Sequence, residues 1–451
     1  MKLLLVTAGS RGDVEPFAAL ARRAAAAGHD VRLAVPDNSG VDLAGLDVRS
    51  LEADFSAMIE SQGVSPLAAM RNLREVVRPV MRGVIVNAAH AALEFRPDVI
   101  AWHPKVLSAP VVADALGIPH VLVEMVPAVT PTREFPAAGT VARDLGPLNR
   151  LSYRAGAAAA GMFRREIDEA ADVMGVGRPH PASAPAATML PISPVILPRP
   201  ADWPETVSLT GPWRASARST AEADAAEAAP ATADSTTTDA AGPAHGASDP
   251  VATDAASAAP TGAILDPALA AFLDGGPFAY AGFGSMAAGD PVARGRALVA
   301  AARARSIRLL VATGLGGIAV PDDLRGDDVF VTRAVDHAAV LPRAIAAVHH
   351  GGIGTVQAAT AAGTVSIIVP FIADQPFWGA TLHRNGLAPA PIPQRRLSAE
   401  RLGEALAAAP AFQPAVDAAA SRMAEEDGSG EALVVLERLA TLPRAATLRH
   451  P

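Results

Sequence analysis

The feature that most constrains the fold is a series of short apolar segments, each followed by polar turn residues and then by residues with helical spacing. In the first half of the chain these segments are residues 3–7, 31–35, 99–102 and 120–123. In the second half they are residues 278–283, 307–312, 329–332, 346–349 and 365–369. Strands that alternate with helices form mostly parallel sheets with helices on both faces. Ligands of such sheets bind beyond the carboxyl ends of the strands.

Residues 215–262 interrupt this pattern with a segment of mostly Ala, Thr, Ser, Asp, Pro and Gly. The segment has no aromatic residue, and Val251 is its only sizeable aliphatic side chain. It buries too little apolar surface to offset the entropy lost on ordering, which predicts a disordered linker. We therefore expect two Rossmann-like domains, residues 1–214 and residues 263–451, the second ending in a C-terminal helix. An insertion within one domain is the alternative.

Composition argues against several classes of protein. The formal net charge of −8 disfavours nucleic acid as a main partner. No stretch approaches the ~20 uncharged apolar residues of a membrane-spanning helix, and the apolar N-terminal run is too short for a signal peptide. The sequence has no cysteine, which excludes disulfides and a thiolate nucleophile. We expect a cytoplasmic protein, a monomer or weak dimer, that acts on small molecules.

The densest group of functional signals begins where an apolar segment ends in His349 and His350. Three glycines follow within four residues, and helical spacing begins near Thr355. Glycine lets a backbone approach a ligand closely, and the free N–H groups of a helix start attract phosphate oxygens. His350 can donate one more hydrogen bond to a phosphate. The pattern predicts a diphosphate-binding turn, although glycines also form ordinary tight turns and buried histidines are common in cores.

A second polar pair follows the next apolar segment along the chain. Asp374 and Gln375 lie in the loop after residues 365–369. An acidic and an amide side chain side by side suit the hydroxyl groups of a sugar, although the pair could equally belong to a plain surface loop. A diphosphate turn together with a hydroxyl-binding pair predicts a nucleotide-sugar site.

These stretches resemble the donor-binding signature of glycosyltransferase family one, in its sterol and natural-product glucosyltransferase branch. The signature reads His-His-Gly-Gly-x-Gly-Thr, then Val-Pro-Phe-x-x-Asp-Gln-Pro-Phe-Trp-Gly, and residues 348–379 are similar to it almost throughout. Residues 9–16 resemble the acceptor-domain loop of the same family. Residues 282–286 resemble its phosphate-contacting loop, and residues 334–337 resemble its base-recognition loop. Residues 215–262 have no counterpart there.

The resemblance implies a GT-B fold, in which two Rossmann-like domains face each other across a cleft. It also implies a UDP- or dTDP-hexose as co-substrate, with no bound cofactor. The residues it places around the donor are Ser10, Arg11, Gly284, Ser285, Val335, His337, His350, Gly351, Gly352, Ile353, Gly354, Thr355, Asp374 and Gln375. Within this set, His350 is expected to stabilise the departing diphosphate. One departure is Ala334, where many relatives carry Asn.

The reaction needs a base that takes a proton from the acceptor hydroxyl, and two residues compete for this role. Asp13 follows the first predicted strand, at the edge where ligands bind. It could also cap a helix that starts near Pro16. His103 follows another predicted strand and has an ordinary pKa closer to neutrality. We favour Asp13 because its stretch resembles the family more closely, and Arg11 beside it could keep the carboxylate ionised.

The acceptor and the stereochemistry are less constrained by the sequence. Side chains that could line an acceptor pocket in the N-terminal domain are Trp102, His103, Met125 and Phe135, although each could equally be core. We expect a lipophilic alcohol such as a sterol, a triterpene or a polyketide-like natural product. The family resemblance implies inversion at the anomeric carbon. Because the sequence has no Asp-x-Asp triplet and no metal-ligand cluster, we expect no metal requirement.

Three other functions share parts of this pattern. A nucleotide-sugar epimerase or hydrolase could use the same fold, and a catalytically silent accessory protein could bind the same donor. A nicotinamide dehydrogenase is disfavoured because the first turn reads Gly-Ser-Arg-Gly-Asp, which is not Gly-x-Gly-x-x-Gly.

Overall fold

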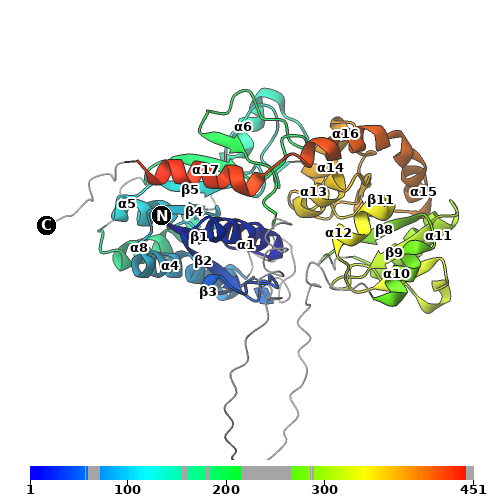
Figure 1. Ribbon diagram of the computed structural model, residues 1–451, viewed down its shortest axis with the longest axis horizontal. Coiled ribbons are helices and arrows are strands. Elements are labelled where there is room, and N and C mark those ends of the chain that lie inside the picture. The colour runs from blue at the N-terminus through cyan, green and yellow to red at the C-terminus, as the bar shows by residue number, and fades with distance from the viewer. Residues whose placement is uncertain are drawn as a thin grey trace, which may run out of the picture.

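The computed structural model describes residues 1–55, 57–58, 72–141, 143–154, 156, 160–177, 182–214, 266–284, 286 and 289–442. The expected linker, residues 215–262, lies outside these residues, and so does Ser285. Figure 1 shows two lobes side by side, one built on each half of the chain.

A seven-stranded sheet organises the first lobe, and all its strand pairs are parallel. In spatial order its strands are β3 (Asp47–Asp54), β2 (Asp30–Asp37), β1 (Lys2–Val6), β4 (Val99–Trp102), β5 (His120–Val123), β6 (Ala187–Leu190) and β7 (Val207–Leu209). The order reverses direction between β1 and β4, and such a switch point is where an open parallel sheet binds its ligand. The loops after β1 and β4 are therefore the expected ligand-binding loops.

A five-stranded parallel sheet organises the second lobe. Its strands in spatial order are β10 (Val329–Thr332), β9 (Arg308–Ala312), β8 (Phe278–Gly282), β11 (Ala344–His349) and β12 (Ser366–Ile368). Here the order reverses between β8 and β11. The turn of glycines after His349 thus lies at the switch point of its own sheet.

Helices cover both faces of each sheet. In the first lobe they are α1 (Arg11–Ala26), α4 (Arg78–Phe95), α5 (Ala109–Leu116), α6 (Asn149–Ser152) and α8 (Arg164–Val173). In the second half of the chain they are α10 (Pro267–Asp274), α11 (Pro291–Arg303), α12 (His337–Val340), α13 (Ile353–Ala361), α14 (Gln375–Arg384), α15 (Ala399–Ala408), α16 (Gln413–Met423) and α17 (Gly428–Ala440). A π-helical turn, η1 (Leu73–Val77), precedes α4. Short 3₁₀ turns are η2 (Gly146–Leu148), η3 (Gly161–Phe163), η4 (Asp322–Leu324), η5 (Leu341–Arg343), η6 (Gln394–Arg396) and η7 (Ala409–Ala411).

The last helix, α17, belongs by sequence to residues 263–451 but packs on the first lobe. Helix α17 returns to the first lobe and packs against α1, as Figure 1 shows. Its apolar face joins the core beneath α1, and Arg23 of α1 pairs with Asp427 at the start of α17 at 3.2 Å. The two lobes are therefore joined by the C-terminal helix as well as by the connection between them.

The packing of α17 gives a first testable expectation. Leu436 is fully buried against α1, whereas Val434 on the same helix is 61% exposed. We expect Leu436→Ala to lower the free energy of unfolding by about 2–4 kcal/mol, because it removes buried methyl groups and leaves a cavity. Val434→Ala is the matched control and should change it by less than about 0.5 kcal/mol. Urea unfolding followed by circular dichroism measures both, and equal effects would contradict this packing.

Direct contacts also join the lobes near the expected ligand edge. Ser193 N donates to Gln357 Oε1 at 2.9 Å, and Asn385 Nδ2 donates to Ile196 O at 2.8 Å. Phe135 packs edge-on against Phe377 at 5.3 Å between ring centroids. These contacts fix the loops of one lobe relative to those of the other.

Candidate active site

The first element of the site is the turn between β1 and α1. Ser10 is the N-cap of α1, with extended backbone angles of φ −85° and ψ −178°, so the helix begins at Arg11 and not near Pro16. Asp13 is therefore the third residue of the helix, and its Oδ2 accepts a hydrogen bond from Ser10 N at 3.0 Å. Gly9 has a φ of +140°, and a Cβ there would lie 1.9 Å from Asp13 Oδ2. Only glycine leaves room for the Asp13 carboxylate against this turn.

Two side chains from the loop after β4 reach the same carboxylate. His103 Nε2 lies 3.3 Å from Asp13 Oδ1, and Lys105 Nζ lies 3.4 Å from Oδ2. Burial raises the pKa of Asp13, but the Lys105 ammonium, the His103 hydrogen bond and the Ser10 N–H together hold this pKa far below its ordinary value. The N-terminal end of α1 also favours a negative charge. Asp13 is an ionised carboxylate whose side chain is 22% exposed.

His103 is buried, and both of its ring nitrogens are engaged by the protein. Its Nδ1 accepts the backbone N–H of Lys105 at 3.2 Å, so Nε2 carries the proton that faces Asp13. Burial lowers the pKa of His103, against the raising effect of the Asp13 hydrogen bond. The imidazole is therefore neutral near pH 7 and acts as a donor to Asp13.

The second lobe contributes the histidine pair at the end of β11. His349 is fully buried; its Nε2 lies 2.9 Å from Ser366 Oγ, and its Nδ1 accepts Gly351 N–H at 3.2 Å. It therefore fixes the turn from within the core. His350 differs, because its buried Nδ1 has no hydrogen-bond partner among the described residues. Burial and the nearby His337 lower the pKa of His350 to about 4, so it is neutral near pH 7.

The turn that follows His350 exposes the start of a helix. Gly351 has a φ of +89°, and Gly352 is the extended N-cap of α13. Gly354 is exposed, and a Cβ there would meet no atom within 4 Å. Gly284 reaches the same place from the loop after β8, since a Cβ on it would lie 3.7 Å from His350 Cε1. An open helix start beside an unpartnered histidine can bind an anion.

A third histidine of the second lobe lies at the start of α12. His337 Nε2 lies 3.1 Å from the Tyr280 hydroxyl, and the two rings are edge-on at 5.6 Å. Burial lowers the pKa of His337, and the charges of Arg11 and Glu15 on α1 also act on it. The start of α1 is thus within electrostatic range of α12, across the two lobes. Val335, two residues earlier, is half-buried against the same apolar cluster as Tyr280.

The loop before α14 presents Asp374 and Gln375. Trp378 Nε1 donates to Asp374 Oδ2 at 2.7 Å, and burial raises the pKa of Asp374. The charges of Asp13 and Lys105 act on Asp374 as well, so the loop before α14 lies within electrostatic range of the Asp13 carboxylate. Gln375 is buried, and its Oε1 accepts the N–H groups of residues 371 and 372 at 2.8 and 3.1 Å. Its amide therefore shapes the loop that carries Asp374.

Comparison with known proteins decides the family. O-mycaminosyltylonolide 6-deoxyallosyltransferase of Streptomyces fradiae is 31% identical over 98% of this chain and 98% of its own length. The chain belongs to the GT-B glycosyltransferases. A sterol 3-beta-glucosyltransferase of Arabidopsis thaliana is 26% identical over 97% of the chain and 68% of its own length. No protein-family profile matches the sequence.

Solved structures agree on the fold of this glycosyltransferase. The crystal structure of the glycotransferase of kitacinnamycin superposes with a TM-score of 0.68 at 18% identity, over 97% of this chain and 99% of that one. Glycosyltransferase VinC, solved in complex with dTDP, gives 0.60 at 16% identity over 98% and 99%. The predicted GT-B fold and the predicted transferase activity are both confirmed.

The side chains expected to line an acceptor pocket do not come together in the glycosyltransferase. Trp102 is buried and donates through Nε1 to His120 Nδ1 at 3.0 Å, in the core under α4. Met125 is buried in the core on the opposite face of the sheet, under α1. Phe135 packs against Phe377 and Trp203 at the contact of the two lobes. Trp102 and Met125 thus lie on opposite faces of the sheet, and Phe135 lies in a loop outside it. Of the expected set, His103 alone lies beside Asp13.

Three residues of the site had no assigned role in the sequence analysis. Lys105 follows His103 by two residues, and its position in the loop after β4 could have indicated a residue of the site. Trp378 belongs to the family signature, and its contact with Asp374 shows what it does there. Tyr280 lies inside an apolar strand, where its hydroxyl gives no pattern in the sequence. Its partner, His337, is 57 positions away.

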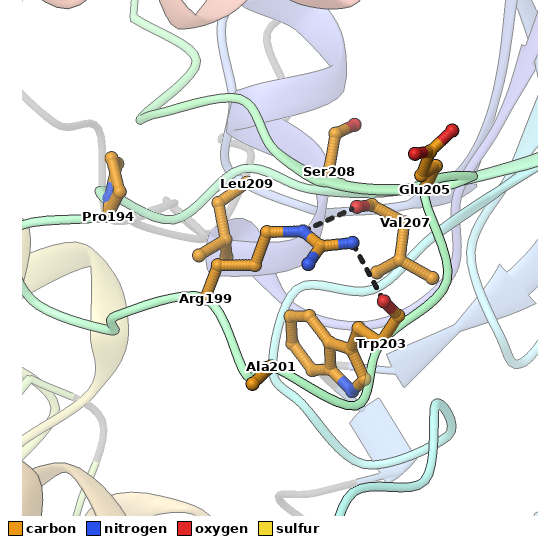
Figure 2. Close-up of a pocket in the computed structure, with 8 residues that line it drawn as sticks. All are labelled: Pro194, Arg199, Ala201, Trp203, Glu205, Val207, Ser208 and Leu209. Atoms are coloured by element: carbon orange, nitrogen blue, oxygen red, sulfur yellow. Dashed lines mark hydrogen bonds between the residues drawn. The ribbon is translucent and has the colours of Figure 1, made fainter.

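A separate hollow of about 610 Å³ lies on the first lobe, beside the segment that leads to β7. Arg199 lies in it, and its guanidinium donates to the carbonyls of Val207 at 3.3 Å and Trp203 at 3.0 Å (Figure 2). The guanidinium in this hollow thus holds the backbone of its own loop.

Among the described residues, no helix is both long and apolar enough to cross a membrane. Those residues also contain no group of three or more His, Cys, Asp or Glu that could hold a metal ion.

Proposed function

We propose that this glycosyltransferase moves a hexose from a UDP- or dTDP-sugar to a hydroxyl of a lipophilic natural product, with inversion and without a divalent metal. The observation that carries the proposal is Asp13, an ionised and partly exposed carboxylate within electrostatic range of Asp374 in the other lobe. A carboxylate in that place can take the proton of an acceptor hydroxyl that lies beside the donor sugar.

The donor in this proposal binds to the second lobe. The start of α13, from Gly351 to Thr355, receives the diphosphate together with His350 and the loop of Gly284 and Ser285. Val335 and His337 flank the base and the ribose, and Tyr280 holds the His337 ring. Asp374 binds a sugar hydroxyl through Oδ1, since Trp378 occupies Oδ2. Gln375 keeps this loop in shape, and Ser10 and Arg11 face the donor from α1. The dTDP complex of VinC supports a nucleotide diphosphate donor.

Asp13 acts as the general base. An ionised carboxylate offers about four acceptor sites. His103 occupies one on Oδ1, while Ser10 N and Lys105 occupy two on Oδ2. The remaining site is on Oδ1, where the acceptor hydroxyl delivers its proton. The acceptor oxygen forms a bond to the anomeric carbon as the bond to the diphosphate breaks, and attack from the opposite face inverts that carbon.

The leaving group departs as a nucleoside diphosphate whose added charge must be stabilised. N–H groups at the start of α13 and the N–H of neutral His350 supply this stabilisation, because donors held by the fold need little reorganisation when the charge develops. These donors perform the task that a divalent cation performs in other transferases. The proposal therefore includes activity in the presence of a chelator.

Relatives support the acceptor class. The named relatives act on O-mycaminosyltylonolide, a sterol and the vancomycin aglycone. What these names share is a sterol or another natural product as the acceptor. We therefore place the acceptor of this enzyme among sterols, triterpenes and polyketide-like natural products.

A ligand panel tests the proposal directly. Thermal shift is measured with UDP, dTDP, GDP and NAD, each with magnesium or with EDTA. A ligand at ~100 times its Kd stabilises by about 2.7 kcal/mol, which raises the Tm by a few degrees. UDP or dTDP should stabilise equally with and without magnesium. The stabilising donor is then incubated with macrolide and sterol acceptors, and product is detected by mass spectrometry. Stabilisation by NAD alone, or a strict need for magnesium, would refute the proposal.

The low pKa of His350 gives a pH-dependent prediction. The free site holds His350 neutral down to about pH 4. A bound diphosphate raises the pKa of His350, because the anion favours the imidazolium. The complex then binds more protons than the free enzyme, so donor affinity should rise as pH falls from 7 to 5. We expect roughly threefold to tenfold tighter binding of an intact nucleotide sugar by calorimetry.

His350→Asn should abolish this pH dependence, because Asn does not titrate. His90→Asn, at an exposed position on α4, is the matched control and should keep the wild-type dependence. An identical pH dependence in His350→Asn would show that another group binds the proton.

A further inference from the structure

Lys105 is held in place by three contacts, one of which is with the Asp13 carboxylate. Its Nζ is 3.4 Å from Asp13 Oδ2, 3.2 Å from Ala8 O and 5.4 Å from the centroid of the Phe55 ring. The side chain remains 41% exposed, so the ammonium pays little for desolvation while its position is fixed. This arrangement places a full positive charge on one oxygen of the proposed base.

The backbone of the same residue acts on the other oxygen. Lys105 N–H donates to His103 Nδ1 at 3.2 Å, which forces the ring proton onto Nε2, the atom that faces Asp13 Oδ1 at 3.3 Å. Lys105 thus reaches Oδ2 directly and Oδ1 through the His103 ring. Asp13 and His103 are the two groups that could serve as the base, and Lys105 influences the protonation state of both.

Composition and space indicate that a compact ammonium is needed here. The chain contains lysine only at positions 2 and 105, although Lys and Arg together number 38. A Cβ on Gly9 would lie 2.7 Å from Lys105 Nζ, so the ammonium lies close against the Gly9 turn. An ammonium is smaller than a planar guanidinium and acts as a point charge. In an otherwise arginine-rich sequence, one of the two lysines thus lies beside this carboxylate.

We propose that Lys105 is the positioning residue that keeps the Asp13 base ionised and oriented, and that it sets the lower pH limit of sugar transfer. The inference rests on the function proposed above, because it assigns Asp13 the role of base. It goes beyond that function in naming the residue that controls the base.

The charges around Asp13 fix the sign of the expected effect. Facing it are His103 and Lys105 from the loop after β4, Asp374 from the loop before α14, and Ser10 N–H at the start of its own helix. On the same helix, Arg11 and Glu15, on either side of Asp13 in the sequence, pair with each other at 3.2 Å. Because His103 is neutral, Lys105 is the cation in contact with the carboxylate. Burial and Asp374 oppose ionisation, so loss of Lys105 raises the pKa of Asp13.

A general base accepts a proton only at a pH above its pKa, so the rate falls at low pH, in the acidic limb of the pH profile. Removing the Lys105 ammonium moves this limb to higher pH. Above that limb Asp13 is ionised again and, with a higher pKa, is a stronger proton acceptor. Loss of Lys105 therefore reduces the rate strongly at low pH and little at high pH. A residue that merely supports the fold would reduce the rate at every pH.

The test is the pH profile of kcat/KM from pH 4.5 to 9, with an acceptor that the wild-type enzyme glycosylates. Lys105→Met and Lys105→Gln are compared with Lys2→Met, which removes the other lysine, paired with Asp30 at 3.8 Å. Wild type and Lys2→Met should show no acidic limb down to pH 4.5, because the pKa of Asp13 lies far below its ordinary value. Both Lys105 variants should show an acidic limb inside the measured range, with a loss relative to wild type of about threefold or more at pH 4.5 and less than about threefold at pH 8.5. A loss that is the same at every pH, or variants without an acidic limb above pH 4.5, overturns the inference.

A second measurement separates this inference from the proposed function. The Asp13 carboxyl carbon is followed by NMR in ¹³C-aspartate-labelled protein, with Asp13→Asn for assignment. Its titration midpoint should rise in Lys105→Met and Lys105→Gln, and stay at the wild-type value in Lys2→Met. An unmoved midpoint overturns the role of Lys105 even when transfer is established. A raised midpoint supports that role even when no tested acceptor is glycosylated. The absence of glycosylation counts against the proposed function alone.

Discussion

Asp13→Asn should lower kcat for sugar transfer by about 10²- to 10⁴-fold, the range expected when a general base is lost. Asparagine keeps the size of the side chain and can still accept the Ser10 N–H through its oxygen. It cannot take the proton of the acceptor hydroxyl. The Kd for the nucleotide sugar should stay within about threefold, since the residues proposed to bind the diphosphate belong to the other lobe.

The comparison needs a control on the same helix. Glu15 is an exposed carboxylate on α1, paired with Arg11 on the surface. Glu15→Gln removes one negative charge beside the site without touching the proposed base, and its kcat should remain within about threefold of wild type, as for most surface ion pairs. Turnover by Asp13→Asn within about tenfold of wild type would remove Asp13 from the role of base and return attention to His103.

The core strands were the most predictable part of the fold. Strands buried on both faces form continuous apolar segments in the sequence, and β4 and β5 begin and end where the sequence predicts. Strand β3 was missed because it is an edge strand, and most of its residues are exposed and polar. Strands β6 and β7 are short and each contains a polar residue, Thr188 and Ser208, so neither forms a continuous apolar segment in the sequence.

Features of the candidate site that depend on neighbouring residues were easier to predict from the sequence than contacts between distant residues. The helix after β1 was expected near Pro16, but Ser10 and Asp13 form the cap and start α1 one turn earlier. The contact of Lys105 with Asp13 joins residues 92 positions apart, and no local pattern encodes it. The return of α17 to the first lobe has the same cause, because an amphipathic helix shows which face it buries but not against which partner.

The glycines after β11 allow a sharp separation of structural from functional roles. Gly351 has a φ of +89°, and a Cβ on it would lie 2.7 Å from Ile368 Cγ2. Gly351→Ala should therefore lower the free energy of unfolding by about 2–4 kcal/mol through backbone strain and crowding. Gly354 lies in the first turn of α13 with open space around it. Gly354→Ala should leave stability unchanged or raise it by up to about 1 kcal/mol.

Donor affinity should distinguish the two glycines further. If the diphosphate rests on the first turn of α13, a methyl group at position 354 occupies the space where backbone and phosphate meet. Gly354→Ala should then weaken nucleotide-sugar binding by about tenfold or more, which is about 1.4 kcal/mol, while the Tm does not fall. Denaturation and calorimetry on the same samples measure both quantities. An unchanged Kd in Gly354→Ala would mean that the phosphate binds elsewhere, because a stable helix with an added methyl group cannot tolerate a ligand packed on that backbone.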